Sequence, residues 1–240
     1  MPYAVPNTMS PNPNPGEHAW HGPLPLANPI AVPRLGEIYS RTAAFYDGLV
    51  AGHQSRAKLA AIDLMARKPG ERFLEVGVGT AWAFERIVAA TGIDAACGID
   101  VAAGMLSVAR ERLAASPWPL ALADARALPF PDAAFDCLLT TYTFEVLPLA
   151  DIGPVIDECR RVLKPGGRLV AVNLTEGEGQ DAAMTEDWKR RFADDPEFFG
   201  GARPLLLQSM LEAHGFHPVT RRYAGPEWPS EVLLALRADA

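Results

Sequence analysis

The feature that most constrains the fold is an alternation of short apolar runs with helical patterns that begins at residue 72. The runs have the length and composition of buried strands, and they cover residues 72–76, 95–99, 119–123, 135–141 and 168–173. Helical patterns fall between most of them, over about 82–90, 103–115 and 152–163. Such alternation predicts an α/β domain with a mainly parallel sheet and helices on both faces.

The helix over about 152–163 has the clearest period on the chain. Its apolar side chains recur at the 3.6-residue spacing, and Lys164-Pro165-Gly166-Gly167 stops it. After an irregular stretch over about 174–203, we expect a helix near 204–214 and two closing strands at 216–223 and 231–237. The expected sheet therefore has seven strands.

Two segments precede this sheet. Residues 1–36 hold 9 of the 22 prolines and only two charged side chains, which predicts an arm that could dock on its own or a neighbouring subunit and support an oligomer. Residues 37–240 form the expected domain. It opens with two helices within 37–68, one from near Glu37 and one over about 55–67.

Charge and hydropathy argue against several kinds of partner. With 22 basic and 29 acidic side chains the net charge is −7, so we expect no nucleic-acid partner. Every apolar run is too short to span a membrane, which leaves peripheral contact. The N-terminal residues show no pattern of a secretory signal or transit peptide. The three cysteines lack CxxC spacing. We therefore expect a cytoplasmic protein with reduced, buried thiols and no metal.

A glycine-containing loop joins the first strand to the next helix. Gly77-Val78-Gly79 lets the backbone turn tightly and approach a ligand, and the helix that follows presents free N–H groups. Asp100 lies 21 residues after Gly79 at the end of the second strand, where a carboxylate can accept both hydroxyls of a ribose. This spacing predicts a cofactor that contains adenosine.

Two side chains discriminate between such cofactors. Trp82 occupies the third position of the GxGxxG pattern and is too bulky for the close approach of a dinucleotide pyrophosphate, which disfavours NAD. Glu75 stands just before the first glycine, where a carboxylate repels phosphate and suits a ligand with an ammonium group. S-adenosylmethionine is such a ligand.

Five segments together resemble a known family. They are residues 74–80, Gly98-Ile99-Asp100 with Met105-Leu106, Asp124-Ala125 with Leu128-Pro129-Phe130, Phe135-Asp136, and the run ECRRVLKPGG at 158–167. From about residue 37 to 237 the chain resembles the class I S-adenosylmethionine-dependent methyltransferases, nearest the branch of ubiquinone/menaquinone and phospholipid methyltransferases. The resemblance implies a Rossmann-like, seven-stranded, mainly parallel sheet whose last strand is antiparallel. It also implies methyl transfer to a small-molecule or lipid-like acceptor.

The resemblance further implies a set of cofactor contacts. They are Tyr39, Glu75, Gly77, Gly79, Asp100, Met105, Asp124, Ala125 and Thr140. Glu75 and the two glycines would surround the methionine end, Asp100 the ribose, Met105 the adenine face and Asp124 the adenine amino group. A core role for Met105 and a turn cap at Asp124 are the alternatives.

For the acceptor, the resemblance points to the N-terminal helix and to the segment after the fourth strand. Tyr39 and Tyr46 lie two helical turns apart on one face, and Tyr46 and Glu145 are the candidate catalytic contacts. The alternatives are tyrosines that pack the helix onto the core and a solvated Glu145 at a helix start. Two other function classes stay open, a non-catalytic S-adenosylmethionine sensor and an NAD-dependent reductase.

Overall fold

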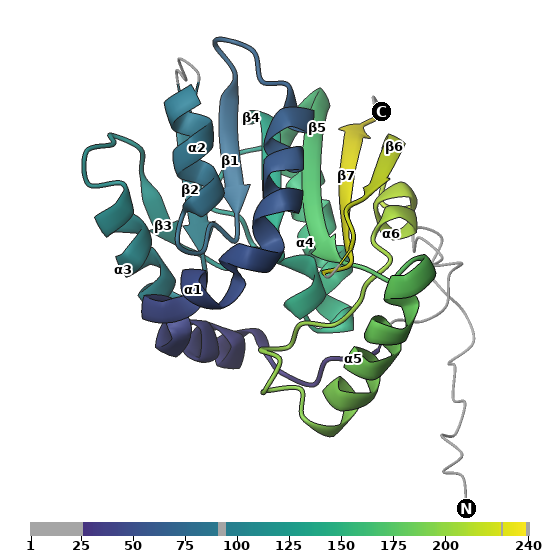
Figure 1. Cartoon of the computed structure of the whole chain (residues 1–240). Helices are drawn as coiled ribbons and strands as arrows, with labels where there is room; N and C mark the ends of the chain where they lie inside the picture. The colour runs from purple at the N-terminus through teal and green to yellow at the C-terminus, as the bar shows by residue number, and fades with distance from the viewer. Residues whose placement is uncertain (1–25, 91–94, 227, 239–240) are drawn as a thin grey trace, which may run out of the picture.

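The computed structural model describes residues 26–90, 95–226 and 228–238, and one seven-stranded sheet organises them (Figure 1). The strand order is β3-β2-β1-β4-β5-β7-β6. The strands are β1 (Arg72–Val76), β2 (Ala95–Asp100), β3 (Leu120–Leu122), β4 (Phe135–Thr141), β5 (Leu163–Leu174), β6 (Phe216–Tyr223) and β7 (Ser230–Arg237). Only β7 runs against the others, since it pairs antiparallel with both β5 and β6. The expected sheet, with its last strand antiparallel, is confirmed.

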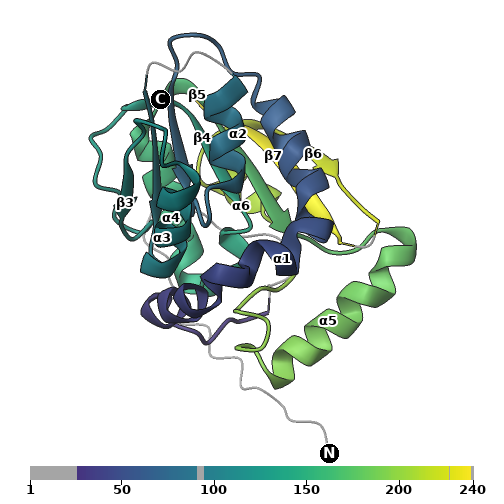
Figure 2. The same cartoon turned by 60° about the vertical axis from the view of Figure 1, so that its left-hand side comes forward.

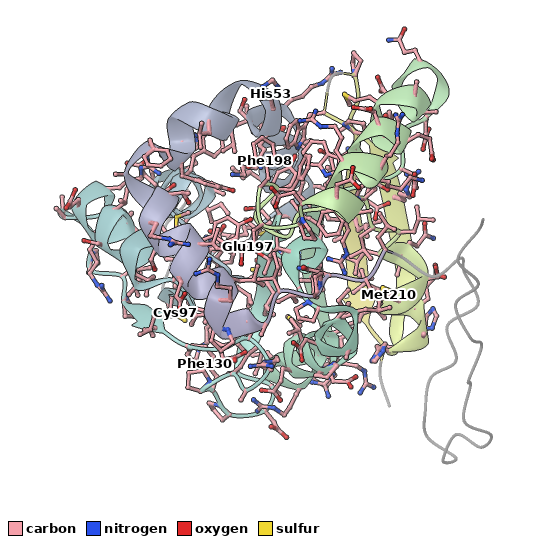
Figure 3. All side chains as sticks on the ribbon, turned by 90° about the horizontal axis from the view of Figure 1, so that it is seen from below. His53, Cys97, Phe130, Glu197, Phe198 and Met210 are labelled. Carbon is pink, nitrogen blue, oxygen red and sulfur yellow. The ribbon has the colours of Figure 1, made fainter. Side chains whose placement is uncertain are left out.

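Helices cover both faces of the sheet, as the alternation predicted (Figures 1 and 2). They are α1 (Val32–Met65), α2 (Trp82–Ala90), α3 (Ala103–Arg112), α4 (Leu149–Val162), α5 (Ala182–Asp194) and α6 (Gln208–Ala213), with short 3-10 turns η1 (Phe144–Val146) and η2 (Gly179–Asp181). One core cluster joins the sheet to α4 and α6. A second cluster joins the opposite face to α1, α2 and α3.

Alternate side chains of the central strands supply these two clusters. Leu138 of β4 packs toward α4, whereas its neighbours Cys137 and Leu139 pack toward α1 and α2, and all three are fully buried. A strand covered on both faces has no reason to alternate apolar with polar residues, which is why these strands appear in the sequence as continuous apolar runs. Each such buried leucine contributes roughly 1.5–3 kcal/mol to stability.

The N-terminal helix differs from the expectation. The sequence predicts two helices, the first from near Glu37, but α1 is a single helix of 34 residues that begins at Val32. Ile30, Val32 and Leu35 are buried, so the fold takes in the last part of the predicted arm. Gly48 and Gly52 weaken the helical pattern between the two expected helices without ending the helix. The rest of the arm, residues 1–25, lies outside the described residues.

The first half of α1 crosses below the sheet, and its second half rises along one face (Figures 1 and 2). The crossing half packs closely on α3, because Gly104 has no side chain. A Cβ at Gly104 would lie 2.4 Å from the carbonyl oxygen of Ser40, and the Gly104 N–H donates to the Ser40 hydroxyl at 3.1 Å. This contact holds α1 over the edge of the sheet at which the parallel strands end.

Three further expectations can be compared with the structure. The stretch over 174–203, expected to be irregular, contains α5, a mostly polar helix that packs on the rest of the molecule through few side chains such as Phe192. Cys137 and Cys159 are buried as expected, but Cys97 is only half-buried. Among the described residues, none of the helices has the length and apolarity needed to cross a membrane.

Candidate functional site

A cavity opens at the edge of the sheet where the parallel strands end, and α1 forms its roof. The ends of β1, β2 and β4 and the turn after β3 supply its floor. Lining residues include Tyr39, Tyr46, Lys58, Glu75, Gly77, Gly79, Trp82, Asp100, Met105, Asp124, Ala125, Thr141, Tyr142 and Thr143. The sequence motifs of four separate segments therefore meet in one place. Open α/β sheets bind ligands at this edge.

The glycine loop adopts a conformation that only glycine takes easily. Gly77 and Gly79 have φ of +73° and +54°, in the left-handed region. A Cβ on Gly77 would lie 2.3 Å from the hydroxyl of Thr143, so the loop packs directly against the end of β4. A Cβ on Gly79 would meet no atom within 4 Å, because this backbone faces the cavity. The loop thus presents bare backbone to a ligand.

Asp100 fastens this loop to the end of β2. Its Oδ2 accepts the Gly79 N–H at 2.8 Å and its Oδ1 accepts the Ala102 N–H at 2.8 Å. Burial raises the pKa of this carboxyl, while the backbone donors oppose that rise. Each oxygen keeps acceptor capacity toward the cavity, since a carboxylate oxygen can accept more than one hydrogen bond.

Glu75 places an acidic group deep in the cavity. Its side chain is 1% exposed, and its Oε2 has no hydrogen-bond partner among the described residues. Burial raises the pKa of Glu75 to about 8, and the nearby ammonium of Lys58 opposes this rise. A buried acceptor without a donor is costly, so this oxygen is suited to a ligand that brings an ammonium or hydroxyl donor.

Met105, Asp124 and Ala125 line the same cavity from the ends of β2 and β3 onward. Met105 is 2% exposed and lines the cavity beside Ala125, so it is both a core side chain and a wall of the site. Asp124 also lines the cavity, but Arg126 holds its carboxylate with a shortest distance of 2.7 Å. That guanidinium keeps the pKa of Asp124 below its usual range. The sequence reasoning missed this ion pair.

The chain was compared with known protein families and structures. A family model described as "Methyltransferase domain" matches residues 74–171, which contain the glycine loop, Asp100 and Asp124. The match covers less than half of the chain, which is similar to methyltransferases over this segment. The "Ubiquinone/menaquinone biosynthesis C-methyltransferase UbiE" of Cellvibrio japonicus is 32% identical over 154 residues, 60% of each chain. The chain therefore spans about three fifths of the length of this curated relative.

Solved structures share the fold of this chain. Phosphoethanolamine N-methyltransferase 2 of Haemonchus contortus, in complex with S-adenosyl-L-methionine, is 16% identical with a TM-score of 0.61, covering 76% of this chain and 52% of that one. The [4+2]-cyclase SpnF is 20% identical with a TM-score of 0.67, covering 89% of this chain and 99% of that one. At these identities the likeness shows the fold alone.

Two tyrosines of α1, Tyr39 and Tyr46, both line the cavity. Their rings pack edge to face with centroids 6.0 Å apart. The Tyr39 hydroxyl donates to the carbonyl oxygen of Gly200 at 3.1 Å. Burial raises the pKa of Tyr46 above its usual range, so its hydroxyl stays protonated at neutral pH. Tyr39 therefore has both a packing role and a place in the cavity wall, and the Tyr46 hydroxyl has the side chain of Gln54 as a hydrogen-bond partner.

Glu145 is not the solvated residue that one alternative described. Its side chain is 1% exposed, its Oε2 has no hydrogen-bond partner among the described residues, and burial raises its pKa to about 8. Its own carbonyl accepts from Arg203, which is fully buried. Glu145 is absent from the cavity lining, whereas Val146 and Leu147 line it. Contact of Glu145 with an acceptor stays a prediction.

Thr140 is the one predicted cofactor residue that the structure keeps away from the cavity. It is fully buried inside the sheet, where it pairs with Val76 of β1 and Ala171 of β5. The cavity is lined instead by the next three residues, Thr141, Tyr142 and Thr143. An apolar run in the sequence does not show at which residue the strand ends. An error of one residue also places the side chain on the other face of the sheet, because side chains alternate along a strand.

Two features of the site were missed by sequence reasoning. Lys58 of α1 lies in the cavity with 8% of its side chain exposed. Asp47, the residue after Tyr46, accepts a hydrogen bond from the Thr80 hydroxyl at 2.7 Å and pairs with Arg112 of α3. A helical wheel of α1 would have placed Lys58 on the side of the helix that carries Ala57 and Ala61, both buried.

Proposed function

We propose that this protein transfers a methyl group from S-adenosylmethionine to a small-molecule or lipid-like acceptor in the cavity under α1. The observation that carries this proposal is the pairing of a cavity-facing glycine backbone at Gly79 with two carboxylates, the buried Glu75 and the half-buried Asp100. The methyltransferase domain match over 74–171 supports the same chemistry.

The residues present fit the parts of this cofactor. The Oε2 of Glu75, which lacks a donor, suits the ammonium group of the methionine moiety. The free acceptor capacity of Asp100 suits the ribose hydroxyls, and Met105 with Ala125 offers an apolar slot for the adenine ring. Asp124 is held by Arg126, so we expect the adenine amino group to share that carboxylate with the guanidinium.

The bound cofactor supplies an electrophilic methyl group on a sulfonium, and its leaving group is a neutral thioether that needs no proton. The chain's own work is therefore to align the acceptor and to exclude water, which positioning can achieve without a strong base. Residues of α1 cover the cavity, and Tyr46 presents a protonated hydroxyl to it. We propose Tyr46 as an acceptor contact on these grounds.

The acceptor is proposed at the level of its class. The curated relative is named for carbon methylation in ubiquinone and menaquinone biosynthesis, so quinol precursors belong in the test panel together with amines and ethanolamine phospholipids. Phe45 and Leu49 are 55% and 60% exposed one turn apart on the helix that roofs the cavity. This apolar pair supports peripheral contact with a lipid phase during acceptor uptake.

Calorimetric titration tests cofactor binding. Asp100→Ala removes the ribose acceptor and the anchor of the glycine loop, so affinity for S-adenosylmethionine should fall by roughly 1–3 kcal/mol. Asp63→Ala is the matched control, because Asp63 is exposed and lies at the far end of α1. Equal affinity in wild type and Asp100→Ala would reject this binding mode.

Turnover separates the enzyme from a non-catalytic binder of the cofactor. The likeness to a cyclase of the same fold favours keeping that second candidate, because a fold does not fix its chemistry. Release of S-adenosylhomocysteine with one member of the acceptor panel, and none without it, is the result expected of a methyltransferase. Tight cofactor binding with no release across the panel would favour the sensor.

A further inference from the structure

Tyr142 follows β4 with a backbone conformation that residues other than glycine rarely adopt. Its φ is +56°, in the left-handed region, and its N–H donates to the carbonyl oxygen of Val172 at 2.7 Å. Continued alternation along the strand would place its side chain with Leu138, on the side of the sheet that α4 covers. Tyr142 packs instead in the cluster on the opposite face, under α1, and lines the cavity. The unusual φ therefore directs this side chain into the site.

The hydrogen bonds of the Tyr142 hydroxyl follow one direction. Its oxygen lies 2.7 Å from the hydroxyl oxygen of Ser230, which is fully buried. Ser230 donates its single hydroxyl proton to the carbonyl oxygen of Trp228 at 3.1 Å. Tyr142 is then the donor to Ser230, and the Tyr142 oxygen keeps its lone pairs as acceptors. A phenol oxygen held in this way can accept a hydrogen bond from a ligand but cannot donate one.

The Tyr142 hydroxyl stays protonated at neutral pH. Burial raises its pKa well above the usual value, and the charges of Glu145 and Tyr46 add to this rise. The same effect shows that Tyr142 lies near Tyr46, the proposed acceptor contact. On its other side, the adjacent Thr143 packs against Gly77 of the glycine loop. Tyr142 thus lies between the proposed acceptor contact and the loop proposed for the cofactor.

The charged groups of the proposed cofactor call for different partners in the cavity. S-adenosylmethionine carries an ammonium, a carboxylate and a methylated sulfonium. Glu75 offers a partner to the ammonium, and Lys58, which also lines the cavity, offers a cation to the carboxylate. The sulfonium methyl group is left. Its hydrogens are polarised by the positive sulfur, so they suit a neutral oxygen that can only accept.

We infer that the Tyr142 oxygen accepts weak hydrogen bonds from the sulfonium methyl group of the cofactor, and that Ser230 is the positioning residue that keeps the lone pairs of this oxygen toward it. The inference rests on the proposed function. The transferred methyl group must lie between cofactor and acceptor, and Tyr142 lies between the residues proposed for each. This contact favours the methylated cofactor over its product, whose neutral thioether has no such hydrogen to donate.

Calorimetric titration with three ligands tests this contact without turnover. S-adenosylmethionine has the polarised methyl group, sinefungin has a charged ammonium group in its place, and S-adenosylhomocysteine has neither. Tyr142→Phe should weaken binding of sinefungin at least about tenfold and of S-adenosylmethionine about threefold, because the acceptor oxygen is lost. Its affinity for S-adenosylhomocysteine should stay within about twofold of the wild-type value.

Tyr223→Phe is the matched control for this variant. It also removes a tyrosine hydroxyl with a hydrogen bond, which Tyr223 donates to Asp181 at 2.6 Å, and Tyr223 does not line the cavity. It should leave all three affinities unchanged.

Ser230→Ala tests the direction of the hydrogen bond. The Tyr142 proton loses its acceptor in this variant and is free to turn toward the cavity, where it opposes a cationic group. Sinefungin and S-adenosylmethionine should therefore bind more weakly than to wild type. S-adenosylhomocysteine should not, because its neutral sulfur has lone pairs that tolerate a donor.

The outcomes separate the two proposals. If wild type binds none of the three ligands, the proposed function fails. If wild type binds them and Tyr142→Phe weakens all three equally, or none, the assignment of Tyr142 is overturned while cofactor binding stands. If Tyr142→Phe does not fold, Ser230→Ala decides, because an unchanged preference among the three ligands in that variant overturns the assignment as well.

Discussion

The carboxylate of Asp47 accepts a hydrogen bond from the hydroxyl of Thr80 at 2.7 Å and also pairs with Arg112, so one side chain of α1 holds both the glycine loop and α3. The Arg112 guanidinium also donates to the Thr80 carbonyl at 2.7 Å. The roof of the cavity is thereby fastened to the loop that faces the cofactor. Attachment of α1 and affinity for the cofactor should depend on each other.

Asp47→Ala tests this coupling. The variant leaves the α1 roof without its link to Thr80 and leaves Arg112 with only the more distant carboxylate of Glu85 at 3.7 Å, so affinity for S-adenosylmethionine should fall about tenfold. Calorimetry measures the affinity, and limited proteolysis within α1 should become faster in the free protein. Asp63→Ala on the same helix should change neither quantity. Unaltered proteolysis and affinity in Asp47→Ala would show that the roof is held by packing alone.

The two glycines Gly79 and Gly166 give a matched test of the cofactor loop. Both have positive φ, +54° and +70°, and an added Cβ would meet no atom within 4 Å at either position. Gly79→Ala and Gly166→Ala should each lose about 1–2 kcal/mol of unfolding free energy from backbone strain. Only Gly79→Ala should also weaken cofactor binding, because its methyl group would enter the cavity. Equal cofactor affinity in the two variants would contradict the placement of the ligand beside Gly79.

The sheet could be predicted from the sequence because most of its strands are apolar runs with a turn signal at the end. β1, β2 and β4 lie where the apolar runs indicated, and Asp100 ends β2 as expected. The continuous α1 could not be predicted, since Gly48 and Gly52 lower local helix propensity and only the contacts of α1 with the core and α3 outweigh this. Local sequence patterns predict where helices and strands lie, whereas tertiary contacts decide whether a helix continues through a segment of low helix propensity.

The part of the candidate site that could be predicted consists of residues whose type is required by the backbone conformation. Glycine and aspartate at the ends of β1 and β2 are required by positive φ and by capping of free N–H groups, and both leave a mark in the sequence. Lys58 left no such mark, because a lysine on a helix is usually solvated and its burial follows from where α1 lies. The Arg126 partner of Asp124 was likewise invisible, since its side-chain direction depends on the turn after β3.

The buried carboxyl of Glu145 predicts a specific pH dependence of stability. Its pKa is raised from 4.5 to about 8 in the folded protein, so between these values the folded state binds one more proton than the unfolded state. The unfolding free energy should therefore decrease as pH rises from about 5 to 8, by at most about 1.4 kcal/mol per pH unit from this group. Glu75 contributes in the same direction.

Glu145→Gln removes one of these two contributions. The variant should lose less stability than wild type between pH 5 and pH 8, as measured by urea unfolding at each pH. Glu111→Gln provides the control, because Glu111 is exposed on α3. A Glu145→Gln curve parallel to that of wild type would mean that the carboxyl ionises in the folded protein as it does in water.

The tyrosine pair of α1 separates acceptor alignment from packing. The Tyr39 hydroxyl is committed to the Gly200 carbonyl, whereas Tyr46 keeps a protonated hydroxyl at the cavity. Tyr39→Phe leaves that carbonyl without its donor and should lower the unfolding free energy by about 1 kcal/mol with little change in kcat. Tyr46→Phe should reduce kcat at least about tenfold while cofactor affinity stays within about threefold, because alignment of the acceptor is needed mainly in the transition state. Steady-state kinetics with an acceptor found in the panel, together with calorimetry, measures both quantities. Wild-type kcat in Tyr46→Phe would reduce Tyr46 to a packing role and leave Glu145 as the remaining acceptor contact predicted from the sequence.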